Sequence, residues 1–85
     1  MTKVLLRQAT NFPPFGFIVL VEVVEGVLKI GMKLNLEGRI MELKRMEALH
    51  KTLNEAKVGE KIWLNLKNGD LKIIQKHISH QVEFI

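Results

Sequence analysis

The chain has 85 residues, of which 47% are apolar and 26% are charged, and it contains no cysteine. A chain of this length forms one domain that buries roughly 60 to 65% of its unfolded surface, so residues 1–85 are expected to be a single domain. The lack of cysteine excludes disulfides, thiolate zinc sites and thiol catalysis, and it fits a reducing cytoplasm. The formal net charge of +4 favours acidic partners such as nucleic acid, although scattered basic residues equally fit an ordinary solvated surface.

Membrane insertion is not expected from the hydropathy of the chain. The longest uncharged apolar run covers residues 17–21, and Glu22 ends it. A run of this length is too short to cross a bilayer as a helix. We therefore expect a cytoplasmic protein with no signal peptide and no membrane partner.

Most of the chain, taken in order, predicts short strands. Residues 3–7 are compatible with a strand, and the prolines within residues 11–16 then interrupt regular structure. Residues 17–24 are mostly β-branched, which predicts a strand buried on most of both faces. Further strands are expected at residues 32–36, 62–66, 71–74 and 81–85, with turns at residues 25–26, 37–38 and 68–70.

Residues 39–57 support a different interpretation. They contain neither glycine nor proline, and Met46, Leu49 and Leu53 recur at helical spacing. Five or six strands in a chain of this length favour an all-β fold, a small barrel or sandwich. A helix at 39–57 would make the fold α+β instead, and local propensity leaves both folds open.

Two blocks of sequence resemble the second domain of elongation factor Tu and its relatives among the translational GTPases. In residues 23–34 (VVEGVLKIGMKL), a valine-ended strand is followed by Gly26, two apolar residues, Lys29 and Gly31. Residues 53–62 (LNEAKVGEKI) resemble a second block of that family. The resemblance covers about residues 17–66 and implies an all-β, small closed β-barrel, in which a strand runs from residue 39 to about 46 and a loop follows it.

The chain lacks the residues that GTP hydrolysis requires. No segment has the form G-x-x-x-x-G-K-[ST], the loop that holds nucleotide phosphates. His77 and His80 have the spacing of metal ligands on a helix but no evident third ligand, and His50 is interpreted as an exposed polar residue. We therefore expect a binding module without catalytic residues, metal or cofactor.

Aromatic residues offer one candidate contact. Phe12, Phe15 and Phe17 surround the two prolines. Such a cluster either plugs one end of a barrel or forms a contact loop, in which Phe12 and Phe15 stack on unpaired bases or enter a partner's pocket. Trp63 lies within a predicted strand and is expected in the core.

Basic residues offer the other candidate contact. Those expected to share a phosphate-binding surface are Lys29, Lys33, Arg39, Lys44, Arg45 and Lys51. The resemblance implies RNA partners, because the family's second domain contacts the acceptor end of aminoacyl-tRNA and similar barrels contact ribosomal RNA. The first hypothesis is thus a non-catalytic module that contacts tRNA, rRNA or a ribonucleoprotein. The alternative is a protein–protein interaction adaptor that binds no nucleic acid and docks its partner through the phenylalanine loop or a barrel edge.

Overall fold

Buried and partly exposed side chains alternate along the strands of the molecule. In β2 (Phe17–Glu25), Val19, Val21 and Val23 are buried while the residues between them remain partly exposed. Successive side chains of a strand point to opposite faces, so this pattern gives β2 one interior face. The computed structural model describes residues 1–13 and 16–85.

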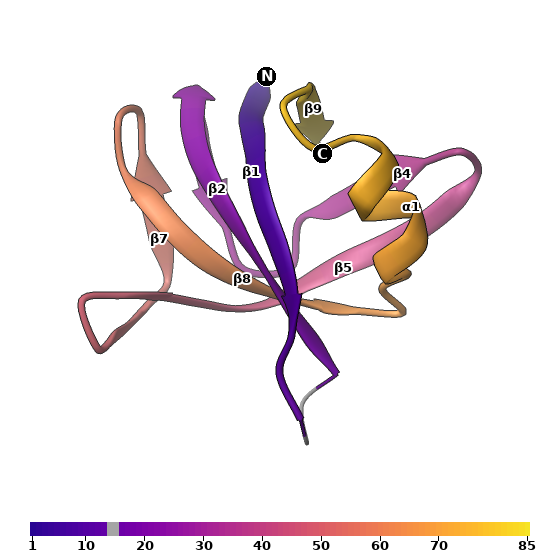
Figure 1. The fold of residues 1–85 in the computed structure, drawn as a ribbon. Coiled ribbons are helices and arrows are strands. Elements are labelled where there is room, and N and C mark those ends of the chain that lie inside the picture. The colour runs from indigo at the N-terminus through magenta and orange to yellow at the C-terminus, as the bar shows by residue number, and fades with distance from the viewer. Residues whose placement is uncertain (14–15) are drawn as a thin grey trace.

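Six strands close into a β-barrel. The elements are β1 (Thr2–Asn11), β2 (Phe17–Glu25), β3 (Val27–Lys29), β4 (Lys33–Leu36), β5 (Arg39–Ala48), β6 (Lys51–Leu53), β7 (Glu55–Lys57), β8 (Lys61–Lys67), α1 (Leu71–Lys76) and β9 (Gln81–Phe84). The strands pair in the order β4-β9-β1-β2-β8-β5, and β5 pairs back with β4 (Figure 1). β6 extends one end of the sheet beside β5, while β3 and β7 form a separate two-stranded sheet. The prediction of an all-β closed barrel is confirmed.

The segment with helical propensity forms strands instead. β5 occupies Arg39–Ala48, and its Met41, Leu43 and Met46 are fully buried in the barrel. Pairing with β4, β8 and β6 satisfies its backbone and overrides the local preference. The alternative of a helix at 39–57 is therefore wrong, and the strand runs two residues further than residue 46.

The helix of the molecule lies where a strand was expected. The Asp70 carboxylate accepts hydrogen bonds from the backbone amides of Lys72 at 3.0 Å and Ile73 at 3.2 Å, which caps the N-terminus of α1. Ile74 of α1 is buried against the core. The predicted strand at residues 71–74 is thus wrong. The Asp70 cap and the burial of Ile74 stabilise a short helix in this segment instead. No helix among the described residues combines the length and the hydropathy needed to cross a bilayer.

The C-terminal strand closes the barrel between β1 and β4, as expected for residues 81–85. β9 pairs with β1 over four residues, from Thr2 opposite Phe84 to Leu5 opposite Gln81. On its other side, Lys33 and Ile85 exchange both backbone hydrogen bonds, at 2.7 and 2.8 Å. Both termini therefore lie at the same end of the barrel, and the paired ends of β1 and β2 at Asn11 and Phe17 lie at the other (Figure 1).

Candidate binding surface

An irregularity in β5 turns two successive cations toward solvent. Leu43 pairs with Leu66 and Arg45 pairs with Asn65, so Lys44 is an extra residue in β5 relative to β8. Such a β-bulge breaks the strict alternation of a strand. Lys44 and Arg45 are consequently both exposed, while the residues that flank them are fully buried. The sequence carries a signal for this, since the apolar spacing of two residues in β5 lengthens to three between Leu43 and Met46.

A strained turn follows directly. Leu49 and His50 join β5 to β6, with Ala48 and Lys51 paired on either side. Both turn residues have positive φ, 50° for Leu49 and 64° for His50. Two-residue hairpin turns of this kind favour Asn-Gly, because other side chains are strained at positive φ. The turn nevertheless places a leucine at its tip, and that leucine is 92% exposed.

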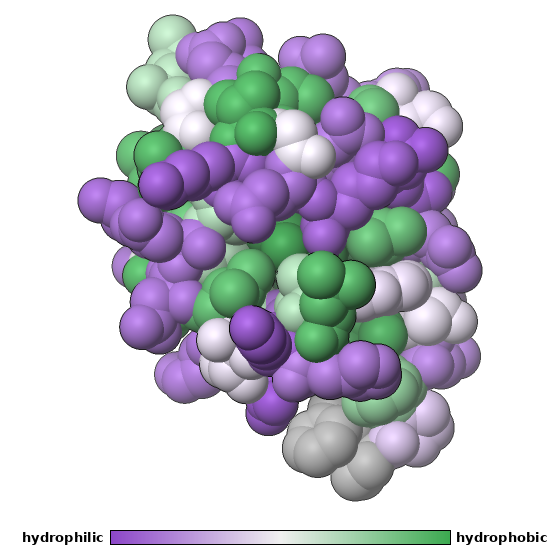
Figure 2. Space-filling view, turned by 90° about the vertical axis from the view of Figure 1, so that its left-hand side faces the viewer, coloured by the Kyte–Doolittle hydropathy of each residue, from purple (hydrophilic) through white to green (hydrophobic). Residues whose placement is uncertain are grey.

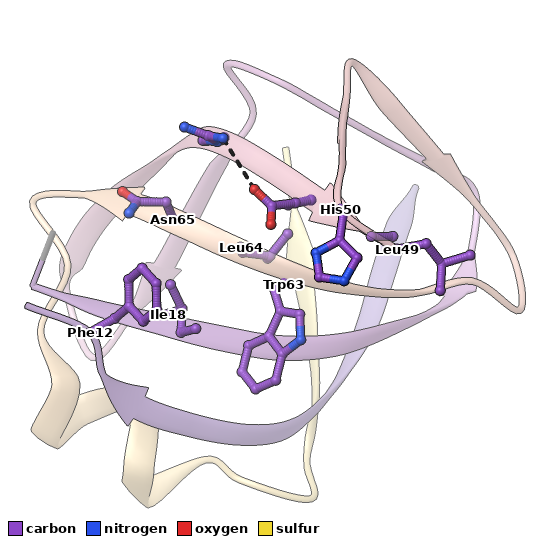
Figure 3. Close-up of a pocket in the computed structure, with 10 residues that line it drawn as sticks. Phe12, Ile18, Leu49, His50, Trp63, Leu64 and Asn65 are labelled. Carbon is purple, nitrogen blue, oxygen red and sulfur yellow. Dashed lines mark hydrogen bonds and ion pairs between the residues drawn. The ribbon is translucent and has the colours of Figure 1, made fainter.

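A groove of about 530 Å³ lies between this turn and the paired ends of β1 and β2, and β8 crosses it (Figure 3). Its lining residues are Phe12, Ile18, Arg45, Glu47, Ala48, Leu49, His50, Trp63, Leu64 and Asn65. Figure 3 shows His50 projecting from the turn toward the strand that carries Trp63, with Phe12 and Ile18 together at the hairpin side. From the left-hand side of Figure 1, apolar side chains appear among hydrophilic ones on this flank of the barrel (Figure 2).

Trp63 belongs to this groove and not to the core, so its predicted position is wrong. Its neighbours Ile62 and Leu64 are buried, which leaves Trp63 on the outer face of β8. There it lies half-buried between Leu20 of β2 and Glu47 of β5. The period-two spacing of Ile62, Leu64 and Leu66 is the sequence signal that predicts an outward Trp63.

Phe12 and Phe17, which flank the prolines, lie in different surroundings. Phe17 packs against the core, and a Cβ added to Gly69 would lie only 2.6 Å from the Phe17 ring, so the glycine makes room for it. Phe12 is 46% exposed and lines the groove. Phe15 lies outside the described residues, so its part in a contact loop stays a prediction.

The predicted basic residues fall into two groups. Lys44 and Arg45 are adjacent on β5, and Arg45 lines the groove. Lys51 begins β6, directly after His50 of the groove, and is paired with Ala48, four residues along β5 from Lys44. Arg45 forms an exposed ion pair with Glu47 at 3.1 Å. No ion pair of Lys44 or Lys51 occurs within residues 1–13 and 16–85.

The remaining three basic residues lie elsewhere. Lys29 is opposite Glu55, and Lys33 is opposite Glu42, so each has an acidic cross-strand neighbour. Arg39 begins β5 at its far end, where its Nε donates to the Asn68 carbonyl at 2.9 Å. Phosphate binding by these three residues stays a prediction. A phosphate would compete with the acidic neighbours of Lys29 and Lys33 and with the Asn68 carbonyl that Arg39 binds.

The histidines are also divided. His50 is exposed, as predicted, and it lines the groove. The His77 Nε2 lies 3.0 Å from a carboxylate oxygen of Glu37 and links α1 to the β4–β5 turn. The rings of His77 and His80 meet edge to face, with centroids 5.7 Å apart.

Comparisons with known proteins place the chain in one family. The family model described as elongation factor Tu domain 4 matches residues 3–82. The translation elongation factor SelB from Methanococcus maripaludis, in its apo form, is structurally similar with a TM-score of 0.76 at 19% identity, over 95% of this chain and 18% of that one. A bacterial selenocysteine-specific elongation factor, EF-Sec, gives a TM-score of 0.74 at 26% identity, over 98% of this chain and 14% of that one. No curated protein matches the chain.

The family model corrects the resemblance drawn from the two sequence blocks. Those blocks suggested domain 2 of the elongation factor Tu family, whereas the model that matches describes domain 4. The β-barrel of a translation factor is common to both assignments. The chain spans less than a fifth of either solved relative. Because the match extends over residues 3–82, the chain belongs to the elongation factor Tu domain 4 family.

Proposed function

We propose that this domain is a non-catalytic RNA-binding module of the cytoplasm, which contacts the phosphates of tRNA, rRNA or a ribonucleoprotein. The bulge at Lys44 is the observation that carries the proposal. It presents Lys44 and Arg45 side by side to solvent, and Lys51 lies on the adjacent β6. Clustered cations of this kind are the usual partners of a phosphate backbone.

The family supports a role in translation. Both solved relatives are elongation factors by description, and EF-Sec is specific for selenocysteine. In both, the matched barrel is a small part of a longer chain. The sequence lacks the phosphate-binding loop that GTP hydrolysis requires. This supports a module that contributes an RNA contact and does not itself hydrolyse GTP.

Salt-dependent binding tests the proposal. We expect a fluorescein-labelled single-stranded RNA to bind in low salt, and its affinity to fall steeply as salt rises because counterions are released. Replacing Lys44 and Lys51 by Glu should weaken binding and reduce the slope of log affinity against log salt by about 0.7 for each lost phosphate contact.

A matched control separates local contacts from net charge. Replacing Lys57 of β7 and Lys72 of α1 by Glu makes the same change, from +4 to 0, since each substitution lowers the charge by two, and neither lysine has an ion pair within the described residues. This pair should weaken binding less and leave the slope nearly intact. Equal effects of the two pairs, or no RNA binding at low salt, would contradict the proposal.

The protein adaptor is the second candidate, and the exposed leucine of the β5–β6 turn favours it. Large apolar side chains that protrude from a surface often enter a partner's pocket. Binding of such a partner would respond to Leu49→Ser and would be nearly insensitive to salt. If RNA affinity does not fall as salt rises, the protein adaptor becomes the favoured function.

A further inference from the structure

We infer that the groove between the β1–β2 hairpin and the β5–β6 turn holds an unpaired nucleotide of RNA, with its base against Trp63 and its phosphate toward Lys44 and Lys51. The inference rests on the proposed function and specifies the form of RNA that is bound. Four observations support it: the groove's shape, its polar side chains that are open to solvent, the nearby positive charge and the strain of the turn.

Flat side chains line the groove. The rings of Phe12, His50 and Trp63 come from three separate segments and line a groove of about 530 Å³ (Figure 3). A space of this size is within the range of small-ligand sites. Aromatic faces hold nucleobases by stacking, which every base permits.

Three polar side chains of the groove form no hydrogen bond with a described residue. The side chains of Trp63, Asn65 and His50 take part in none of the hydrogen bonds among residues 1–13 and 16–85. Asn65 is half-buried and labelled in Figure 3 beside the groove. Its amide offers both donors and an acceptor, as a base edge requires. An apolar peptide segment would leave these groups unsatisfied, whereas a base would not.

Charge complementarity favours the same occupant. Arg45 forms part of the groove wall. Lys44 directly precedes Arg45, Lys51 directly follows His50 of the groove, and neither lysine has an ion pair in the described chain. Glu47 also lines the groove, but it is bound to Arg45. A phosphate therefore meets more positive than negative charge here. Duplex RNA hides its bases within the helix, so only an unpaired nucleotide can reach both the rings and the cations.

The turn adds an independent indication. Leu49 and His50 adopt positive φ without glycine, although the surrounding strands would accept Asn-Gly. Strain of this type is concentrated at functional sites. Here it holds the imidazole on the groove side and the leucine at its rim.

Trp63 is the only tryptophan, so its fluorescence reports on the groove alone. We would titrate the protein with a ten-nucleotide oligouridylate, with an abasic oligomer of the same length and charge, and with an RNA duplex. The oligouridylate should quench Trp63 and bind about 5- to 150-fold more tightly than the abasic oligomer, which corresponds to one to three kcal/mol of stacking. The duplex should cause no quenching.

Variants of the groove extend the test. Trp63→Leu should remove most of the preference for oligouridylate over the abasic oligomer, measured by anisotropy of labelled RNA. Leu49→Asn combined with His50→Gly should weaken binding of oligouridylate while raising the melting temperature, so misfolding cannot explain the loss. Ile40→Asn is the control, because Ile40 is exposed by 55% near the other end of β5 and should not alter binding.

The outcomes separate the inference from the function on which it rests. Equal, salt-dependent affinity for oligouridylate and the abasic oligomer, without quenching, would overturn the nucleotide site and leave the phosphate-binding module intact. Failure of all three RNAs to bind at low salt would overturn both the nucleotide site and the RNA-binding function. The protein adaptor would then be the remaining candidate function. Unchanged base preference in Trp63→Leu would also overturn the inference.

Discussion

Strand β5 is bounded by two turns of the same type that differ in composition. Glu37 and Gly38 precede it, with φ of 54° and 83°, while Leu49 and His50 follow it, with φ of 50° and 64°. Each turn has two residues between paired strand ends. The first has glycine at its second position, as the backbone prefers, whereas the second has none.

The two turns also differ in their surroundings. Glu37 is held by His77 at 3.0 Å and by Lys76 at 3.7 Å, which ties the first turn to α1. No such bond reaches the side chains of Leu49 and His50 from another described residue, and the leucine is almost fully exposed. The first turn is thus built for stability. The second turn has a non-glycine residue at positive φ in both positions, whereas the first has one only at Glu37.

The largest expected effect comes from a substitution in the buried face of β5, the strand that both turns flank. Leu43 is fully buried in β5, and its backbone exchanges hydrogen bonds of 2.8 Å with Gly31 and Met32. Leu43→Ala should lower the free energy of unfolding by about 2 to 5 kcal/mol, measured by urea denaturation. Leu49→Ala, the exposed counterpart, should change it by less than about 0.5 kcal/mol. Similar losses from the two would contradict the barrel interior described for β5.

Alanine at the second position of each turn compares their backbone strain. Gly38 has a φ of +83°, and nothing lies within 4 Å of a Cβ added there. Gly38→Ala should therefore cost about 1 to 2 kcal/mol through backbone strain alone. His50→Ala should cost less than about 0.5 kcal/mol, because the strain is already present. Thermal unfolding followed by circular dichroism would measure both, and equal costs would refute the assignment of strain to Leu49 and His50.

Giving the second turn the preferred sequence should stabilise the protein. Leu49→Asn with His50→Gly should raise the free energy of unfolding by about 1 kcal/mol, since both residues then accept positive φ. Chemical denaturation at equilibrium would show the gain. A loss of stability would mean that the leucine and histidine make contacts that outweigh their backbone strain.

The tether of the first turn should have the smallest effect. Glu37 and His77 have side chains that are 41% and 26% exposed, so solvent screens their interaction. A double-mutant cycle of Glu37→Ala and His77→Ala should give a coupling of at most about 1 kcal/mol. A much larger coupling would show that α1 depends on this contact for its position.

The sequence predicts the barrel because the residues that fill its interior follow local patterns typical of strands. The β-branched residues of β2 and the alternation of Ile62, Leu64 and Leu66 place most strands correctly. Residues 39–57 mislead because helix formers there are compatible with strands, and only pairing with distant segments decides. Asp70 follows Asn68 and Gly69, a sequence typical of a turn, and the same aspartate is a preferred helix N-cap, so the local sequence fits both structures.

The candidate site is harder to foresee, because it depends on contacts between remote segments. The β1–β2 and β5–β6 hairpins and the pairing of β8 with β2 and β5 bring Phe12, His50 and Trp63 to one groove, which no short pattern encodes. Lys44, Arg45 and Lys51 were selected from the sequence for their charge. Their separation from Arg39 follows only from the ten-residue length of β5.

The pairing of β1 with β9 determines how the domain responds to mechanical load. Thr2 lies opposite Phe84 in neighbouring antiparallel strands, so a force applied through both ends acts across the ladder. Such a force peels the hydrogen-bonded pairs one after another, from Thr2 and Phe84 inward to Leu5 and Gln81, and does not shear them all at once. Under tension within a longer polypeptide, the barrel would therefore open at this seam first, while β5 and both of its turns remain paired.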